Sequence, residues 1–126
     1  MKVGYFDSKE FACNDGSVSP YGEMNVVMEL VELLNHIREL YGKPIVVTSG
    51  YRSPAHNKKV GGVSNSQHIY GRAADIKPLS KNASDIAQLQ FICLSANPKG
   101  GVGLYDTFCH VDVRGRKALW DNRTKK

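Results

Sequence analysis

A stripe of apolar residues between positions 24 and 40 is the feature that most restricts how this chain can fold. Five of these residues recur at steps of three and four positions: Val27, Leu30, Val31, Leu34 and Ile37. The spacing places them on one side of an amphipathic helix, which we predict over residues 24–40. Gly42 and Pro44 are expected to end this helix, because glycine adopts the left-handed cap conformation and proline blocks continuation.

Short runs of β-branched and apolar residues predict strands elsewhere in the chain, at residues 44–48, 72–76, 101–105 and 108–113. The last two runs are close enough in sequence to pair as an antiparallel hairpin. Ser84 is expected to cap a second helix that closes before Asn97, and Phe6 and Phe11 are expected to attach the irregular first twenty residues to the core. We therefore predict a single α+β domain, in which two main helices pack on a small antiparallel sheet.

The positive charge of the chain is confined to its C-terminal end. Its 126 residues carry a formal net charge of +5, from 17 Lys and Arg against 12 Asp and Glu. The residues before Arg114 contain 11 cations and 11 acids, whereas those from Arg114 onward contain six cations and one acid. We therefore expect a neutral domain at residues 1–120 and a basic tail at residues 121–126, suited to an anionic partner such as a nucleic acid or a cell-wall polymer.

Several sequence features bear on the compartment in which the protein works. No apolar run approaches the roughly 18 residues that cross a bilayer, so membrane insertion is not expected. The N-terminal residues lack the apolar run of a secretory signal, which predicts synthesis in the cytoplasm. The three cysteines, Cys13, Cys93 and Cys109, cannot form a closed set of disulfides and show no C-x-x-C spacing, so we expect reduced and mostly buried thiols.

Two of the four histidines stand in patterns that suggest chemistry. His36 falls in the long predicted helix and His56 in a polar loop, where surface roles are expected. His68 lies seven residues before Asp75, and His110 lies on the last predicted strand. Zn²⁺ accepts neutral imidazole and carboxylate ligands, and a catalytic zinc site uses three protein ligands. Two histidines and an aspartate from separate elements could therefore form such a site.

A long ordered motif makes the sequence recognisable. It reads Ser66, His68, Gly71, Ala73 and Asp75, and it is accompanied by Ser49-Gly50-Tyr51-Arg52-Ser53 and by His110-Val111-Asp112-Val113-Arg114. With these motifs the chain resembles the M15 family of zinc peptidases, of the D-alanyl-D-alanine carboxypeptidase type, over nearly its whole length. The resemblance implies that residues 1–120 are the catalytic domain, that His68, Asp75 and His110 bind one zinc ion, and that Arg52 binds the substrate carboxylate. Ser66 is expected either to orient the bound substrate or to satisfy its own loop.

The general base is the point at which the chain departs from the family. Several members place an acidic residue three positions before the last histidine, and this chain has Thr107 there. Strand alternation puts Asp112 on the same face as His110, and Asp106 lies in the preceding turn. We expect Asp112, in preference to Asp106, to accept the proton; the alternative is that Asp112 orients an imidazole or pairs with Arg114.

The expected function is zinc-dependent hydrolysis of peptidoglycan stem peptides that contain D-amino acids. The activity would be that of a D-Ala-D-Ala carboxypeptidase or of a murein endopeptidase such as a phage or prophage endolysin, acting on the cell wall after release by a monomeric protein. One alternative is a zinc-binding cell-wall recognition domain without catalytic activity. Another is a small basic nucleic-acid-binding module, which the neutral body and the absence of zinc-finger or RRM patterns disfavour, so no nucleic-acid partner is expected.

Overall fold

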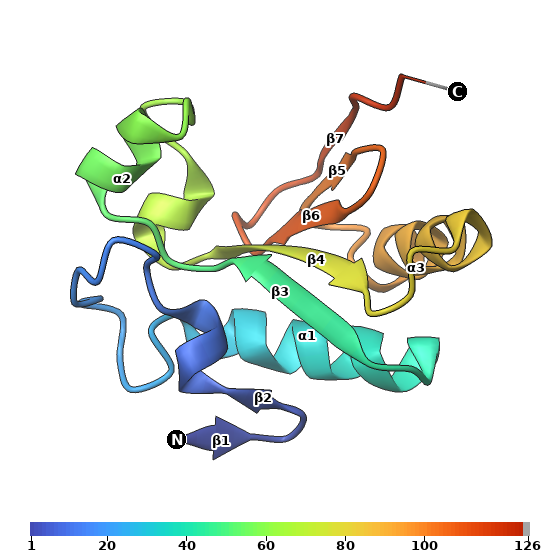
Figure 1. Ribbon diagram of the computed structural model, residues 1–126, viewed down its shortest axis with the longest axis horizontal. Helices are drawn as coiled ribbons and strands as arrows, with labels where there is room; N and C mark the ends of the chain where they lie inside the picture. Colours follow the sequence, from blue (N-terminus) through green and yellow to red (C-terminus); the bar gives the residue numbers. More distant parts are fainter. Residues whose placement is uncertain (125–126) are drawn as a thin grey trace.

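Five strands of the protein form one sheet, as seen in a computed structural model that describes residues 1–124 (Figure 1). Their order in the sheet is β3 (Ile45–Ser49), β4 (Ala73–Pro78), β6 (Cys109–Asp112), β5 (Gly101–Leu104) and β7 (Ala118–Asp121). Neighbouring strands from β3 to β5 are antiparallel, and β7 pairs with β5 in parallel. The predicted α+β class and the predicted hairpin of β5 and β6 are confirmed, whereas β7 was not predicted.

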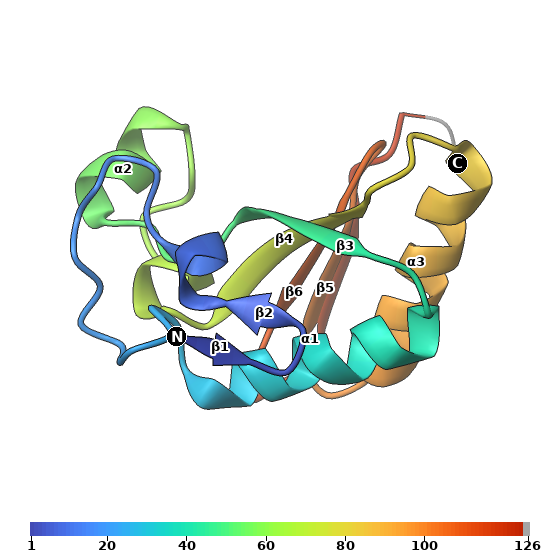
Figure 2. The same ribbon diagram turned by 60° about the horizontal axis from the view of Figure 1, so that its bottom comes forward.

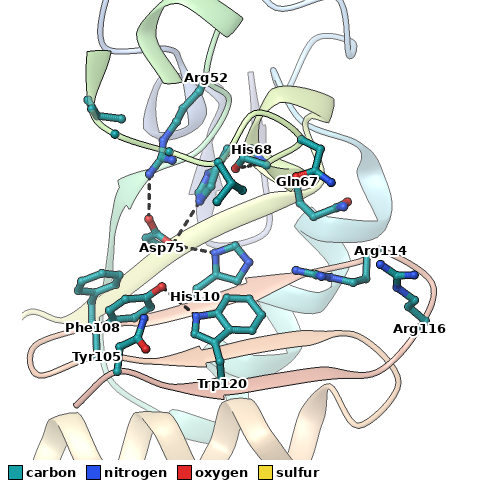
Figure 3. A pocket seen from close by; sticks show the side chains of 17 residues that line it. Arg52, Gln67, His68, Asp75, Tyr105, Phe108, His110, Arg114, Arg116 and Trp120 are labelled. Atoms are coloured by element: carbon teal, nitrogen blue, oxygen red, sulfur yellow. Dashed lines mark hydrogen bonds and ion pairs between the residues drawn. The ribbon is translucent and has the colours of Figure 1, made fainter. Parts of the chain in front are cut away.

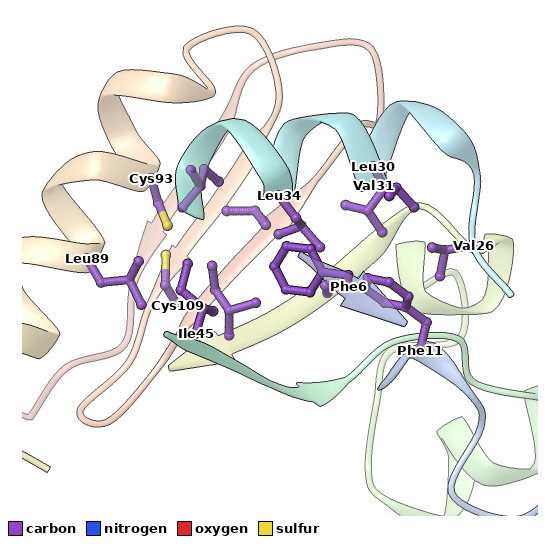
Figure 4. Packing of buried hydrophobic residues seen from close by; sticks show 14 of the residues in the cluster. Phe6, Phe11, Val26, Leu30, Val31, Leu34, Ile45, Leu89, Cys93 and Cys109 are labelled. Atoms are coloured by element: carbon purple, nitrogen blue, oxygen red, sulfur yellow. The ribbon is translucent and has the colours of Figure 1, made fainter. Parts of the chain in front are cut away.

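The two long helices cover one face of this sheet (Figures 1 and 2). They are α1 (Met28–Tyr41) and α3 (Ala83–Ala96), which contact each other, and α3 also contacts β4, β5 and β6. Side chains from this face of the sheet, such as Ile76 and Val111, are buried against apolar residues of the helices, such as Leu34 and Leu89 (Figure 4). Because strand side chains alternate, the opposite face of β4 and β6 is left to other residues.

The start of α1 differs from the prediction. The apolar stripe is buried as expected, and Gly42 ends the helix in the left-handed conformation with a φ of 75°. The helix begins at Met28 instead of Met24, because Asn25 has a φ of 67° and Val27 is extended. The backbone N–H of Val27 donates to the carbonyl of Gly71 at 2.8 Å, so a contact that is distant in sequence delays the helix.

Smaller differences concern element ends. The cap of α3 is Asn82 instead of Ser84, since the Asn82 side chain accepts from the backbone N–H of Ser84 at 2.9 Å. Strand β4 runs on through Pro78, which pairs with Ile45 at the end of the ladder. A short α-helix, α2 (Pro54–Lys59), follows β3.

The N-terminal segment forms short elements that cap the core. They are β1 (Lys2–Val3), β2 (Phe6–Asp7) and the 3-10 helix η1 (Ser8–Phe11), and a further 3-10 helix, η2 (Gln67–Tyr70), precedes β4. Phe6 and Phe11 are both fully buried, as expected, and their rings lie 5.9 Å apart. They fix a segment that has little regular structure of its own.

The three cysteines are free and buried, as predicted. The basic tail predicted at residues 121–126 starts at the last residue of β7, and its residues 125 and 126 lie outside the described part of the chain. Within residues 1–124, no helix combines the length and the apolar character needed to span a membrane.

Candidate active site

A single transverse row of residues on the open face of the sheet forms the base of the site. Asp75 on β4 pairs with His110 on β6, His110 pairs with Gly103 on β5, and Gly103 pairs with Trp120 on β7. Side chains of directly paired residues point to the same face. A Cβ atom at Gly103 would clash with the Trp120 indole, so glycine leaves room for the Trp120 ring, whose centroid lies 5.0 Å from that of His110.

His68 reaches this row from η2. The hydroxyl of Ser66 accepts from the backbone N–H of His68 at 3.2 Å and so caps the short helix. Gly71 ends it with a φ of 65°, a conformation that favours glycine, and turns the chain into β4. The Nδ1 atom of His68 donates to the Gly50 carbonyl at 2.7 Å, so Nε2 is the nitrogen that faces the site, 3.3 Å from Asp75 Oδ1.

His110 contacts the same carboxylate oxygen of Asp75. Its Nδ1 atom lies 3.1 Å from Asp75 Oδ1, and its Nε2 atom lies 2.7 Å from Asp112 Oδ2. An ionised carboxylate only accepts hydrogen bonds, so the Nε2 atom of His110 is protonated and donates a hydrogen bond to Asp112. The Nδ1 atom of His110 is therefore the nitrogen available to a ligand. In Figure 3, dashed lines join Asp75 to both His68 and His110.

These three side chains fit one zinc ion. Ligand atoms of His68, Asp75 and His110 all lie within 4.8 Å of one another, and the three residues are buried. Each imidazole has its other nitrogen held by a protein acceptor, an arrangement that fixes the orientation of metal-binding histidines. Two neutral nitrogens and one carboxylate oxygen form the donor set of an open zinc site.

The pKa values of these groups follow from their contacts. Burial by itself would raise the pKa of Asp75, but hydrogen bonds from His110 and His68 outweigh it and hold this pKa well below its usual range. Burial would lower the pKa of His110, but hydrogen bonds to Asp112 and Asp75 outweigh it and raise this pKa above its usual value. Without a metal ion, the cluster therefore favours an ionised carboxylate beside a protonated His110.

Arg52 lies at the edge of the same cluster. It follows β3, and its guanidinium donates to Ser49 Oγ at 3.1 Å, Asn57 Oδ1 at 3.2 Å and Asp75 Oδ2 at 3.4 Å. Its backbone N–H donates to the His68 carbonyl at 3.1 Å. These contacts hold a permanently charged, planar donor group beside the metal ligands.

A cavity of about 620 Å³ opens over the row of residues. Its lining includes the three ligands together with Arg52, Ser66, Arg114 and Arg116. One wall is aromatic: the rings of Tyr105 and Phe108 stack with centroids 4.4 Å apart. The indole N–H of Trp120 donates to the Tyr105 hydroxyl oxygen at 2.9 Å, which leaves the Tyr105 O–H free to donate (Figure 3).

The two aspartates expected to accept a proton do not line this cavity. Asp112 is fully buried. One of its oxygens accepts a hydrogen bond from His110, and the other accepts one from the Gly101 N–H at 3.1 Å. Arg114 donates to both oxygens of Asp112, at 2.8 and 2.7 Å. Asp106 is exposed and accepts from Thr124. Neither aspartate therefore places a carboxylate in the cavity, so a base at either residue stays a prediction, and the contacts of Asp112 are those of its alternative role in orienting His110.

The structure also places the other residues that the sequence analysis singled out. His36 is exposed and His56 is half-buried on α2, and neither lines the cavity. Ser66 has both the capping role and a place in the cavity lining. Sequence reasoning missed the aromatic wall, although the apolar run at residues 118–120 was a signal for a further strand.

Comparisons with known proteins identify the family of the chain. The sequence profile of peptidase M15 matches residues 4–112. Over 46 residues, or 36% of this chain, the sequence is 50% identical to the zinc D-Ala-D-Ala carboxypeptidase of Streptomyces albus G, and the match covers 18% of that protein. The crystal structure of the L-Ala D-Glu endopeptidase ChiX of Serratia marcescens is similar with a TM-score of 0.49 and 22% identity, over 58% of this chain and 62% of that one. The chain thus spans less than two thirds of both proteins, and the family match over residues 4–112 shows that it belongs to the peptidase M15 family.

Proposed function

We propose that this protein is a zinc peptidase that hydrolyses peptidoglycan stem peptides containing D-amino acids. The observation that carries the proposal is the convergence of His68, Asp75 and His110 at the base of a cavity bordered by arginines. The name of the carboxypeptidase that shares 50% identity over 46 residues supports both the metal and the substrate class.

The metal ligands and the residues around them would each have a different role in binding the substrate. Zinc held by the three side chains would supply Lewis-acid activation of a peptide carbonyl and of water. Arg52 would bind the free carboxylate of the peptide, because its planar guanidinium matches that group in two hydrogen bonds. Ser66 would form a hydrogen bond with the bound peptide near His68, since this residue lines the same cavity.

Tyr105 is a further candidate for substrate activation. Its hydroxyl oxygen is occupied by the Trp120 N–H, so its proton points away from that bond and is free for a ligand in the cavity. A fixed donor aimed at a carbonyl oxygen stabilises the negative charge that develops there during hydrolysis. We propose this role for Tyr105.

One observation favours a second candidate function. Among residues 1–124, Asp75 is the one carboxylate that lines the cavity, and it belongs to the metal ligands. A zinc-binding domain that recognises peptidoglycan without cutting it would need no separate proton acceptor. The two candidates share the fold, the metal and the ligand class, and they differ in turnover.

Digestion of purified peptidoglycan, followed by mass spectrometry of the soluble products, separates the two candidates. A peptidase releases products that disappear when a chelator is added, and their masses identify the bond: free D-alanine for a carboxypeptidase, separated peptides for an endopeptidase. A recognition domain co-sediments with peptidoglycan and releases nothing. Absence of both turnover and binding would contradict the proposed substrate class.

The charge of the C-terminal end is partly neutralised in the fold. Arg114 and Arg123 each bind the aspartate two residues before them, Asp112 and Asp121, through backbone and guanidinium donors. This pairing supports our proposal that the monomeric protein has no nucleic-acid partner. A gel-shift experiment with duplex DNA at low salt tests that proposal, and a sequence-independent shift would contradict it.

A further inference from the structure

A second group of metal-ligating side chains lies outside the cavity. Cys13 and Asp15 follow η1, and His56 lies on α2. Their ligand atoms are within 4.8 Å of one another, and none of the three residues lines the cavity. The segment after η1 and helix α2, which carry these residues, lie side by side in Figures 1 and 2.

Ser53 holds the three residues in place. Its backbone N–H donates to Cys13 Sγ at 3.3 Å, and its hydroxyl donates to Asp15 Oδ2 at 2.8 Å. The backbone N–H of His56 donates to the same hydroxyl at 3.1 Å. Hydrogen bonds of this kind, from neighbouring residues to the donor atoms, orient metal ligands before the ion arrives.

The donor atoms are available to an ion from solution. Asp15 is exposed and His56 is half-buried, so the group opens to solvent. Within the described part of the chain, the ring nitrogens of His56 make no hydrogen bond, whereas those of His68 and His110 are both engaged. The imidazole of His56 can therefore turn its lone pair to a ligand without losing a partner.

We propose that Cys13, Asp15 and His56 form a second binding site for a divalent ion of the zinc type. A sulfur, an imidazole nitrogen and a carboxylate oxygen suit Zn²⁺ or Co²⁺, whereas Ca²⁺ and Mg²⁺ prefer oxygen ligands alone. Three protein ligands leave one position for water. The site differs from the cavity site in containing sulfur, and this difference makes it separately measurable.

An ion at this site would join two segments that differ in rigidity. The segment after η1 has little regular structure, while α2 starts at Pro54, two residues after Arg52. Because Ser53 contacts all three ligand residues and is bonded to Arg52, the ion would stabilise the turn that carries the Arg52 guanidinium. Binding to the folded chain alone would raise the melting temperature as the concentration of free zinc rises.

Cobalt substitution tests the proposal without using activity. Stripped protein is titrated with Co²⁺, and the near-ultraviolet absorption that arises from a thiolate bound to cobalt is recorded. Wild type and His68→Ala are expected to show the band, because Cys13 is intact in both, and Cys13→Ser is expected to lose it. A band that persists in Cys13→Ser would assign it to another cysteine and overturn the site.

Zinc content provides an independent count. Wild type and the surface control His36→Gln are expected to hold two zinc ions per chain, and Cys13→Ser is expected to hold one. Asp15→Asn and His56→Gln retain all three cysteines, so they give the same test if Cys13→Ser does not fold. One zinc ion in wild type, or two in all three of these variants, would overturn the proposal. Neither the cobalt band nor the zinc content depends on the proposed peptidase activity.

Discussion

The His110 imidazole is held by Asp112, two residues along the same strand, through a hydrogen bond of 2.7 Å from Nε2 to Oδ2. Asp112 has no exposed surface, and Arg114 and the backbone of Gly101 occupy the rest of its carboxylate. The carboxylate therefore fixes which nitrogen of His110 faces Asp75. This geometry lets Asp112 act on the site by positioning His110.

Asp112→Asn is expected to destabilise the protein by about 3 kcal/mol, because it removes the charge of a fully buried carboxylate that pairs with the half-buried Arg114. Urea unfolding measures this loss. Asp106→Asn is the matched control: Asp106 is exposed, and its loss should cost less than about 1 kcal/mol. An Asp112→Asn protein of normal stability would contradict this expectation.

Low pH is expected to lower the free energy of unfolding through the protonation of Asp112. Burial raises the pKa of Asp112, but hydrogen bonds from Arg114 and His110 outweigh it and keep this pKa below the ordinary value of 3.8. The unfolded chain thus binds the proton more readily, so the carboxylate stabilises the fold above that value, and the contribution is lost as pH falls through the folded pKa. Urea unfolding between about pH 5 and pH 2 should show a smaller decline for Asp112→Asn than for wild type. Equal declines would contradict this.

His68→Ala is expected to lower the zinc bound at the cavity by one ion per chain. An open zinc site has only three protein ligands, and the loss of one leaves too few to hold the ion. Elemental analysis of untagged protein measures the loss, and His36→Gln, which alters an exposed histidine of α1, should lose none. Peptidoglycan turnover should fall with the metal. Equal zinc in wild type and His68→Ala would contradict the ligand assignment.

Arg52→Lys is expected to raise KM for peptides with a free C-terminal carboxylate by roughly 10- to 100-fold, since lysine cannot make the paired hydrogen bonds of a guanidinium. Peptides with an amidated C-terminus should be affected far less, and this contrast separates recognition from misfolding. Arg72→Lys, at an exposed position outside the cavity lining, is the control. A uniform loss with both peptides would contradict the assigned role.

Tyr105→Phe is expected to lower kcat by about 10²-fold with little change in KM, because the hydroxyl donor would act only on the charge that develops during hydrolysis. The stacked Phe108 ring should keep the substituted ring in place. Tyr70→Phe, at an exposed residue that does not line the cavity, should leave kcat unchanged. An unchanged kcat in Tyr105→Phe would remove Tyr105 from the reaction.

Local patterns in the chain were sufficient for its main elements and for one face of the site. The apolar stripe predicted α1, because helical periodicity requires no knowledge of partners. Alternation on the last predicted strand placed His110 and Asp112 on one face, and their hydrogen bond confirms it. The motif from Ser66 to Asp75 carried the family resemblance, which the match over residues 4–112 confirms.

Other features depended on contacts between distant residues. The first turn of α1 is displaced by the hydrogen bond from Val27 to Gly71, which no local pattern contains. Trp120 joins the site because β7 pairs in parallel with β5 and because Gly103 leaves space for its ring. Strand order is a property of the whole sheet, so this aromatic wall was absent from the sequence-based prediction.

The sequence by itself determined which side chains are present and their spacing within each element, and this spacing predicted the α+β class. The histidine and aspartate ligand set followed from the family resemblance. Only the tertiary structure decided which of the aspartates meet the cavity. A carboxylate can serve as a ligand, a positioning group or a surface acceptor according to its burial and its partners, and these differ among Asp75, Asp112 and Asp106. Burial and partners depend on how the strands are ordered, which short-range spacing does not specify.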